Sequence, residues 1–289
     1  MLVLFTDTDT DLTPVEAKKL GYKLISMPYV IDDKEIHPFE KGDNFDYKTF
    51  YEMLRGGTIP KTCALSPNSY INYFEEEFKK GNDILYVHFS KAMSGTFDSM
   101  NIALEELYTI YPNRKVYTID TKGISILSYI IVKEVAKLYN QGMKVEDILK
   151  WANEEIDHYA VYFYADDLKF FQKSGRVSNF TAIMGNLIGI HPILNMGSDG
   201  IMRSISKARG KTNTLLKILD YVEDLEYNIK DYPVIIGHSD ALDIANTLSK
   251  MLKDKFGDDL NTEIVWVNPT AGSHCGPSTI GVTFHSKRR

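Results

Sequence analysis

Aspartate and threonine alternate just after the first apolar run, in the segment Thr6–Thr13 (T-D-T-D-T-D-L-T). Carboxylates at alternate positions can chelate a hard cation such as Mg²⁺ or Ca²⁺. The segment fails as an EF-hand loop, because Leu12 and Lys18 stand where that loop needs glycine and glutamate. It does fit the D-x-D-x-T pattern of a Mg²⁺-dependent phosphatase that uses Asp9 and Asp11. Short Asp and Thr side chains also close turns and cap helices, and we favour that structural role.

A serine follows a strand-like run in the segment Val234–Ala241 (V-I-I-G-H-S-D-A). The G-x-S-x-A pattern is close to the turn that lifts a nucleophilic serine above an α/β-hydrolase sheet. Ser239, an aspartate at 258 or 259 and His274 follow one another in the order that such a triad requires. Little chain remains for this fold beyond Ser239, so a serine hydrolase is the weaker alternative and a capped strand–turn–helix is favoured.

A Ser-Gly-Thr turn follows the strand expected at Ile84–Phe89. Beyond the turn, apolar residues recur at helical spacing: Phe97, Met100, Leu104, Leu107 and Tyr111. The first backbone N–H groups of a helix lack partners within it and attract an anion. Ser94 and Thr96 add hydroxyl donors, and Gly95 lets a ligand approach the backbone closely. The turn thus suits an anion site at the carboxyl end of a parallel strand, although an ordinary helix N-cap explains the same residues when they are taken alone.

One histidine lies in the segment Thr270–Pro277 (T-A-G-S-H-C-G-P), which its glycines and proline mark as a loop between two strands. His274 can donate a hydrogen bond to an anion or bind a metal ion. Only Cys275 stands beside it as a further zinc ligand, so a zinc site is not expected. We expect neither a metal ion nor a cofactor.

The order of these elements predicts an α/β fold. Strands alternate with amphipathic helices in the first half, which predicts a mostly parallel sheet flanked by helices. After about residue 158, a hairpin joins Pro192–Met196 to Ile201–Ser206, and helix–strand units follow. We expect an α/β domain over residues 1–158 and a smaller α+β domain over residues 159–289. Because no linker separates them, the two domains should pack tightly together.

Several local elements can also be assigned. Thr13 should cap a helix that begins at Pro14 and ends at Gly21, and the next strand should run over Tyr22–Ile31. Further helices are expected at Asp46–Leu54, Asp166–Phe171, Asn213–Tyr227 and Ala241–Phe256.

Composition excludes several classes of protein. The chain has 289 residues, of which 44% are hydrophobic, and a net charge of -6, which disfavours binding to nucleic acids or anionic lipid surfaces. No apolar run reaches the ~20 residues that span a bilayer, and the first residues do not resemble a signal peptide. Two cysteines are too few for a disulfide framework, so the cytoplasm is expected. The basic run Lys287–Arg289 should be solvated.

Eight stretches, taken in order, resemble the motifs of the DegV family over essentially the whole chain. They are Thr6–Leu12 (T-D-x-x-x-D-L), Lys61–Ser66 (near T-S-Q-P-S), Ser90–Phe97 (near S-S-x-L-S-G-T-Y), Ile119–Thr121, Asp167–Ser178 (its end near G-G-R-I-S), Ile190–Leu194, Lys207–Arg209 and His274–Gly281 (near H-x-G-P-G-A-L-G).

The resemblance implies a carrier that encloses a long-chain fatty acid (C14–C18 class) in an apolar tunnel between two domains. The family's carboxylate-binding residues fall here on Thr62 and Ser94 with Gly95 in the first domain, and on His274 in the second. Some family members present the bound carboxylate to a fatty acid kinase. The resemblance therefore implies a non-catalytic subunit whose partner is the kinase catalytic subunit.

Two arginines on motif loops, Arg176 and Arg209, are candidates for contact with that partner. The chain departs from the family pattern at Cys63–Leu65, where S-Q-P is usual. This loop is therefore less polar here than in the family pattern. Cys63 and Cys275 each follow an inferred ligand residue, so the two thiols should be neighbours that could pair under oxidation.

Overall fold

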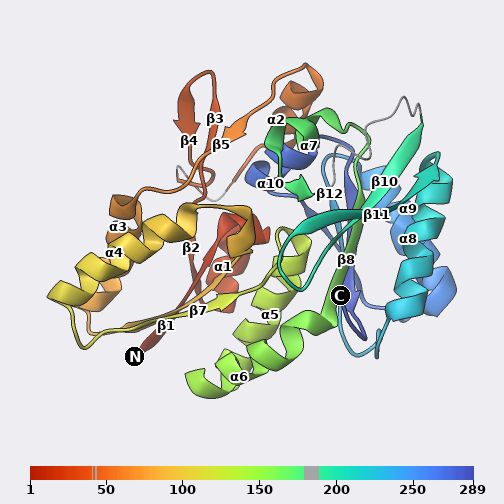
Figure 1. Ribbon diagram of the computed structural model, residues 1–289. Coiled ribbons are helices and arrows are strands. Elements are labelled where there is room, and N and C mark those ends of the chain that lie inside the picture. Colours follow the sequence, from red (N-terminus) through yellow and green to blue (C-terminus); the bar gives the residue numbers. More distant parts are fainter. Residues whose placement is uncertain (41, 43, 179–188) are drawn as a thin grey trace.

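The computed structural model of the chain describes residues 1–40, 42, 44–178 and 189–289. A parallel four-stranded sheet, in the order β2-β1-β6-β7, organises the first half (Figure 1). Its strands are β1 (Leu2–Asp7), β2 (Tyr22–Ile25), β6 (Asp83–His88) and β7 (Val116–Asp120). One face packs against α3 (Pro67–Lys79) and α4 (Thr96–Ile110), and the other against α1 (Pro14–Leu20), α5 (Ile126–Asn140) and α6 (Val145–Glu155). The predicted parallel sheet flanked by helices is confirmed.

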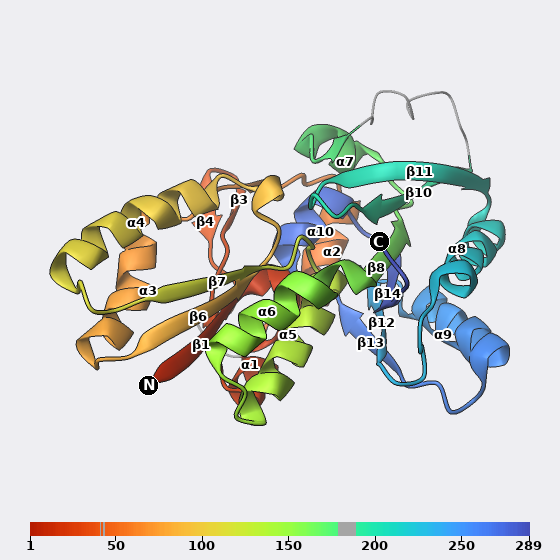
Figure 2. The same cartoon turned by 60° about the horizontal axis from the view of Figure 1, so that its bottom comes forward.

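A mixed seven-stranded sheet, in the order β13-β12-β14-β8-β10-β11-β9, organises the second half (Figure 2). Its strands are β8 (Tyr159–Tyr164), β9 (Val177–Ser178), β10 (Ile190–Met196), β11 (Met202–Arg209), β12 (Val234–His238), β13 (Thr262–Trp266) and β14 (Ile280–His285). The helices α8 (Lys211–Leu225) and α9 (Leu242–Phe256) cover its outer face. The hairpin predicted around residues 197–200 is the β10–β11 pair.

A third, three-stranded sheet joins β4 (Lys34–Ile36), β3 (Tyr29–Ile31) and β5 (Lys61–Thr62). The helices α2 (Tyr47–Arg55) and α10 (Pro269–Cys275) pack beside it, and α7 (Lys169–Ser174) packs against α10. The described residues also include the short 3-10 helices η1 (Thr8–Thr10), η2 (Lys91–Met93) and η3 (Ile156–His158). This small sheet therefore brings β5, from the first half of the chain, next to α10 from its end.

The two halves share one core across α5. Its apolar side chains pack against Leu85 and Val87 of the first sheet and against Val161 and Ile235 of the second. Strands up to residue 120 pair within the four-stranded and three-stranded sheets, and strands from residue 159 pair within the seven-stranded sheet. The division into domains at residue 158 stays a prediction, because α5 belongs to the packing of both halves. No helix in the described ranges is long and apolar enough to cross a membrane.

Several sequence assignments are wrong. The single strand expected at Tyr22–Ile31 is two strands in different sheets, because the chain turns at Ser26–Pro28. The loop expected at Thr270–Pro277 is mostly the helix α10, whose first turn is capped by Asn268 and begins at Pro269. The short helix expected at Asp166–Phe171 begins at Lys169. The helices α3 and α6 were not predicted.

Asp11 joins three distant segments just after β1. Its buried carboxylate accepts hydrogen bonds from the Ser125 hydroxyl before α5, and from the backbone and side-chain N–H groups of Asn268 before α10, at 2.8 and 2.7 Å. Burial raises the pKa of Asp11 to about 7, although these hydrogen bonds limit the rise. The start of α1, capped by Thr13 as predicted, follows directly.

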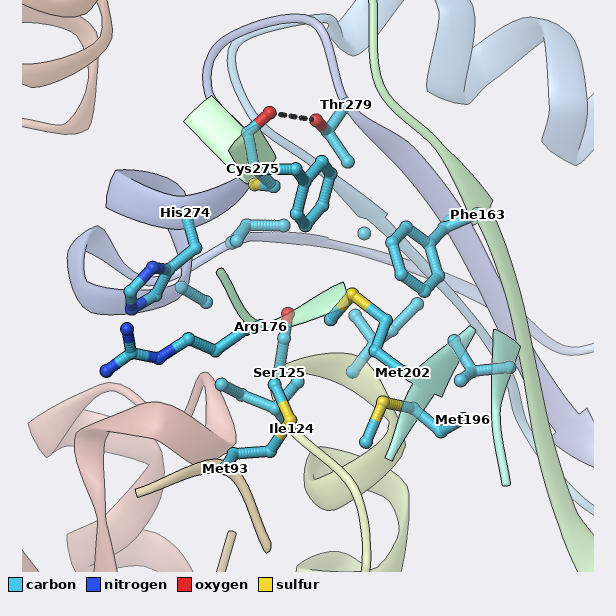
Figure 3. Close-up of a pocket in the computed structure, with 17 residues that line it drawn as sticks. Met93, Ile124, Ser125, Phe163, Arg176, Met196, Met202, His274, Cys275 and Thr279 are labelled. Atoms are coloured by element: carbon cyan, nitrogen blue, oxygen red, sulfur yellow. Dashed lines mark hydrogen bonds between the residues drawn. The ribbon is translucent and has the colours of Figure 1, made fainter. Parts of the chain in front are cut away.

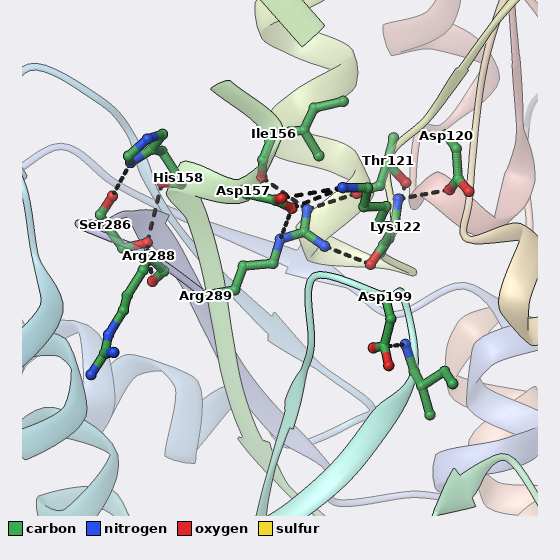
Figure 4. A network of polar contacts seen from close by, with 12 residues as sticks. Asp120, Thr121, Lys122, Ile156, Asp157, His158, Asp199, Ser286, Arg288 and Arg289 are labelled. Atoms are coloured by element: carbon green, nitrogen blue, oxygen red, sulfur yellow. Dashed lines mark hydrogen bonds and ion pairs between the residues drawn. The ribbon is translucent and has the colours of Figure 1, made fainter. Parts of the chain in front are cut away.

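Arg289 forms a second junction between the halves (Figure 4). Its guanidinium donates to the carbonyls of Lys122, Thr121 and Ile156 at 2.7, 2.7 and 2.9 Å. Only 2% of its side chain is exposed, and Asp157 lies 3.8 Å from its Nε. Burial lowers the pKa of Arg289 to about 10, which still leaves it charged at neutral pH. The expectation that Lys287–Arg289 is wholly solvated is therefore wrong at its last residue.

Replacing Asp11 with asparagine should make stability less dependent on pH. The folded chain holds the Asp11 proton up to about pH 7, whereas the unfolded chain releases it near an ordinary aspartate value. The stability that this proton contributes is full at low pH and is lost as the pH rises through 7. In the wild type, this proton makes the free energy of unfolding fall as the pH rises. We expect Asp11→Asn to make that fall shallower by up to ~1.4 kcal/mol per pH unit between about pH 4 and 7, measured by urea unfolding.

The matched control is Asp33→Asn, because Asp33 is exposed and has nearly the same backbone, with φ 58° against 60° for Asp11. That variant should keep the wild-type slope. An unchanged slope in Asp11→Asn would show that Asp11 is ionised in the folded protein.

Arg289→Ala should destabilise the fold, because three carbonyls between the halves lose a charged donor. We expect the free energy of unfolding in urea to fall by roughly 2–4 kcal/mol. Arg288→Ala is the control, since Arg288 is exposed and should change stability by less than ~0.5 kcal/mol. Equal effects of the two variants would contradict a structural role for Arg289.

Candidate functional site

A polar cavity lies where β5, the turn before α4 and α10 meet. Thr62, at the end of β5, and His274, in α10, form a hydrogen bond of 3.0 Å between Oγ1 and Nε2. Ser94 and Gly95, between η2 and α4, line the same cavity. The structure therefore brings together the four residues for which the sequence predicted a carboxylate-binding role.

The turn at Ser94 leaves one hydroxyl proton available. The Ser94 oxygen accepts a hydrogen bond of 3.2 Å from the Thr96 backbone N–H, so its own proton is free to point into the cavity. The Thr96 hydroxyl is engaged elsewhere, with the Leu65 N–H at 3.1 Å and the Tyr70 hydroxyl at 3.0 Å. Either hydroxyl of the Tyr70–Thr96 pair can be the donor, so the expectation that Thr96 donates to a ligand stays a prediction.

His274 presents a neutral imidazole to the cavity. Burial lowers its pKa to about 4, and the positive charge of Arg176 lowers it further. At neutral pH the ring has one N–H donor and one acceptor nitrogen, and its contact with Thr62 orients it. This pair can give hydrogen bonds to an anion without adding a charge of its own.

An apolar cavity adjoins the polar one between the two large sheets. The apolar cavity has a volume of about 60 Å³ and the polar one about 210 Å³, so their walls must move apart to reach the ~300–1,000 Å³ of typical small-molecule sites. Figure 3 shows His274 and Arg176 together at one end and Phe163, Met196 and Met202 toward the other. Both cavities share the same four lining residues: Met93, Ile124, Arg176 and His274. The joined space suits an elongated apolar ligand with an anionic head.

Two glycines on neighbouring strands make room for the apolar cavity. Gly237 of β12 pairs with Gly281 of β14, and both line the cavity. A Cβ atom at Gly237 would lie 2.6 Å from Ile126, and one at Gly281 would lie 2.9 Å from Phe163. Any side chain at either position would have to displace the neighbours that bound this space.

Exposed cations surround the opening of the polar cavity. Lys61 and Lys173 line one further cavity that also includes Thr62 and His274, and Lys91 lines another that includes Ser94. Arg176 lines both. None of these four cations has a carboxylate partner among the described residues. The opening is thus locally positive, although the chain carries a net charge of -6.

Arg209 lies away from these cavities. It is exposed at the end of β11, while β9, next to Arg176, pairs with the start of that strand. At ~3.3 Å per residue, the two ends of β11 are roughly 20 Å apart. The two arginines named from the sequence therefore mark different parts of the surface.

The geometry gives little support to a Mg²⁺-dependent phosphatase. Asp11 is saturated by Ser125 and Asn268, and Asp7 accepts from the Tyr86 hydroxyl at 2.9 Å. Within the part of the chain that the structure describes, no cluster of three His, Cys, Asp or Glu side chains could hold a metal ion. Of Asp9 and Asp11, Asp9 alone lines the polar cavity.

A serine hydrolase centred on Ser239 is not supported either. The buried Ser239 hydroxyl donates to the Gly276 carbonyl at 2.7 Å and accepts from the Thr279 N–H at 2.7 Å. Asp259 pairs instead with Lys230, and His274 pairs with Thr62. Ser239 therefore ties the end of β12 to the residues that precede β14, which is a structural role.

The two cysteines are free thiols in different surroundings. Cys63 lies 3.7 Å from Glu35, whereas buried Cys275 contacts the Gly276 carbonyl. Burial raises the pKa of Cys63 to about 11 and that of Cys275 to about 12, so neither is a reactive thiolate at neutral pH. Their oxidation to a disulfide stays a prediction.

Sequence reasoning did not identify the residues of the apolar cavity. Phe163, Met196 and Met202 come from three strands of the second sheet, and Met93 and Ile124 from two turns of the first half. Their apolar character fits any core, so nothing in their local sequence marks them. The pairing of β12 with β14, which places Gly237 opposite Gly281, depends on the tertiary fold and cannot be predicted from the local sequence.

Comparison with known proteins places this geometry in a family. A DegV domain-containing protein of Clostridium perfringens is 31% identical over 286 residues, covering 98% of this chain and 96% of that protein. A fatty acid binding DegV family protein from Streptococcus agalactiae has a similar structure, with a TM-score of 0.82, 26% identity and coverage of 100% and 99%. A stearic acid-binding protein from Eubacterium ventriosum has a TM-score of 0.86 at 19% identity, with 99% of each chain covered. A model of the DegV family, described as uncharacterised proteins, matches residues 1–287, and the chain belongs to that family.

Proposed function

We propose that this protein binds a long-chain fatty acid of the C14–C18 class and does not itself catalyse a reaction. The observation that carries the proposal is the junction of the two cavities, where polar donors meet a space lined almost entirely by apolar side chains. Thr62, Ser94, Gly95 and His274 would hold the carboxylate, and the acyl chain would lie toward Met196 and Met202. The relatives from Streptococcus agalactiae and Eubacterium ventriosum, described as binding fatty acid and stearic acid, support this ligand class.

The energetics of burial suit this assignment. An unpaired buried carboxylate is very costly, so the head group needs several donors, each contributing about 1.5–3 kcal/mol. The Ser94 hydroxyl and the Thr62–His274 pair can supply them beside the positive charge of Arg176. Most of the affinity would come from the acyl chain, at roughly 0.8 kcal/mol for each buried CH₂ group.

We further propose that the bound carboxylate is presented to the catalytic subunit of a fatty acid kinase. The head-group end of the joined cavity lies beside the openings that Lys61, Lys91, Lys173 and Arg176 line. A locally positive rim attracts an acidic partner surface and steers its approach. Arg209, at the other end of β11, is a separate candidate for the same partner.

Loss of the head-group donors should weaken retention of fatty acid. We expect Ser94→Ala and His274→Ala each to reduce affinity for palmitic acid roughly 10-fold or more, because each removes a hydrogen bond to a charged group. Native mass spectrometry of protein purified from bacteria measures the retained acid, and titration with palmitic acid measures affinity. Ser249→Ala, on α9 and outside both cavities, is the control and should bind as the wild type does. Wild-type protein that neither retains nor takes up the acid would overturn the proposal.

Charge reversal at the opening should impair the reaction with the kinase but not binding of the acid. We expect the double variant Lys61→Glu, Lys173→Glu to raise the KM of the kinase for the loaded carrier ~10-fold, because steering by the positive rim is lost. Acyl phosphate formation with the kinase catalytic subunit and ATP is the measurement.

Two matched charge reversals locate the contact. Lys250→Glu, exposed on α9, should leave the KM unchanged. Arg209→Glu tests whether the interface extends along β11. If only Arg209→Glu raises the KM, the partner binds there and not at the opening.

A further inference from the structure

One buried carboxyl group in the polar cavity has no assigned role. Asp9, in η1, is 3% exposed and lines the cavity together with Thr62, Ser94 and His274. Its Oδ1 is buried and has no hydrogen-bond partner among the residues that the structure describes. A buried polar atom without a partner is costly, and native structures keep few of them. The position of Asp9 on the cavity wall makes a ligand the natural partner.

The two neighbouring carboxyl groups differ from Asp9 in this respect. Asp7 accepts hydrogen bonds from the Tyr86 hydroxyl and from the backbone N–H groups of Phe89 and Asp9, at 2.9, 3.3 and 3.0 Å. Asp11 is held by Ser125 and Asn268. Each of these groups has donors that stabilise its ionised form. Asp9 has fewer, and it lies between two potential negative charges.

The remaining groups that face Asp9 decide its protonation state. From α10, the Thr270 hydroxyl lies near it and the neutral imidazole of His274 lines the same cavity, while Tyr70 approaches from α3. Cys63, whose thiol is protonated at neutral pH, and Arg176 complete the titratable groups on the cavity wall. Burial, followed by the charge of Asp7, raises the pKa of Asp9 well above its ordinary value, and Thr270 offsets only part of this. These surroundings favour the neutral carboxyl form of Asp9, which has an O–H to donate.

We propose that Asp9 donates a hydrogen bond from its protonated carboxyl to the carboxylate of the bound ligand. The head-group site then holds one anion and one shared proton, with Asp9 on the floor and Thr62, Ser94 and His274 around it. This inference rests on the proposed function, and adds to it a proton-bearing ligand residue. It also selects for ligands with an anionic oxygen acceptor, because a cationic ammonium head has no acceptor for the Asp9 O–H.

The arrangement makes affinity depend on pH with a definite sign. The bound anion favours the protonated form of Asp9, so binding is strongest where Asp9 already carries its proton. Above the pKa of Asp9 in the free protein, affinity should fall by up to ~10-fold per pH unit. His274 does not contribute in this range, since its pKa is lowered to about 4. Asp7 and Asp11 have pKa values raised to about 7 and must be controlled for.

Titration of palmitic acid into wild type, Asp9→Asn and Asp9→Ala from about pH 6.5 to about 9.5 tests the proposal, since the ligand itself stays ionised there. Asparagine keeps the shape and offers an N–H donor that does not titrate. We expect Asp9→Asn to bind within ~3-fold of wild type at pH 7 and to lose the fall in affinity at high pH. Asp9→Ala should bind roughly 10-fold more weakly than Asp9→Asn at every pH, because it has no donor at this position. Thermal unfolding of each variant verifies the fold, and the isosteric Asp9→Asn provides a folded comparison if Asp9→Ala is unstable.

Three results would overturn the role of Asp9. Unchanged affinity in Asp9→Ala would show that Asp9 does not touch the ligand. Binding ~10-fold tighter in Asp9→Asn would show that Asp9 is ionised and repels the carboxylate. A pH dependence that persists in Asp9→Asn would belong to Asp7 or Asp11. Each of these leaves the proposed function intact, whereas failure of the wild type to bind palmitic or stearic acid would overturn both.

Discussion

The buried carboxylate of Asp11 is the interaction on which the other features depend. It holds together the end of β1, the residue before α5 and the residue before α10. Ser125 lines the apolar cavity, and α10 carries His274 at the polar one. Because an unpaired buried carboxylate is so unfavourable, the three segments must approach to satisfy it. The same contact therefore closes the fold and sets the distance between the two parts of the site.

Charges of both signs lie around the head-group site. Exposed Lys61, Lys91 and Lys173 line the neighbouring openings, Arg176 lines both these openings and the polar cavity, and Asp9 lines the polar cavity with the neutral donors. An anion that enters meets attraction at the rim and then uncharged donors. Fully ionised aspartates would repel it at the floor, so their neutral form matters as much as the cations do. Net charge alone, which is negative for this chain, gives no indication of this arrangement.

Local patterns in the sequence predict the local parts of the structure. The strand–turn–helix around Ser94 could be predicted because its strand, its turn and its apolar stripe are contiguous. The pairing of Thr62 with His274 could not, because these residues are 212 positions apart and depend on the small sheet beside α10. Their site role came from family resemblance alone. The helix α10 could not be predicted either, because Thr270, Gly272 and Ser273 disfavour a helix that burial and the Asn268 cap nevertheless stabilise.

Two positions without side chains, Gly237 and Gly281, limit the shape of the apolar cavity. These glycines face each other across β12 and β14, on the wall of the space assigned to the acyl chain. A single added methyl group at either position would intrude on Ile126 or Phe163. For the proposed ligand, the space for the acyl chain and the groups that hold the carboxylate would thus lie on separate elements. A substitution at either glycine would change the room for the chain without touching Thr62, Ser94 or His274.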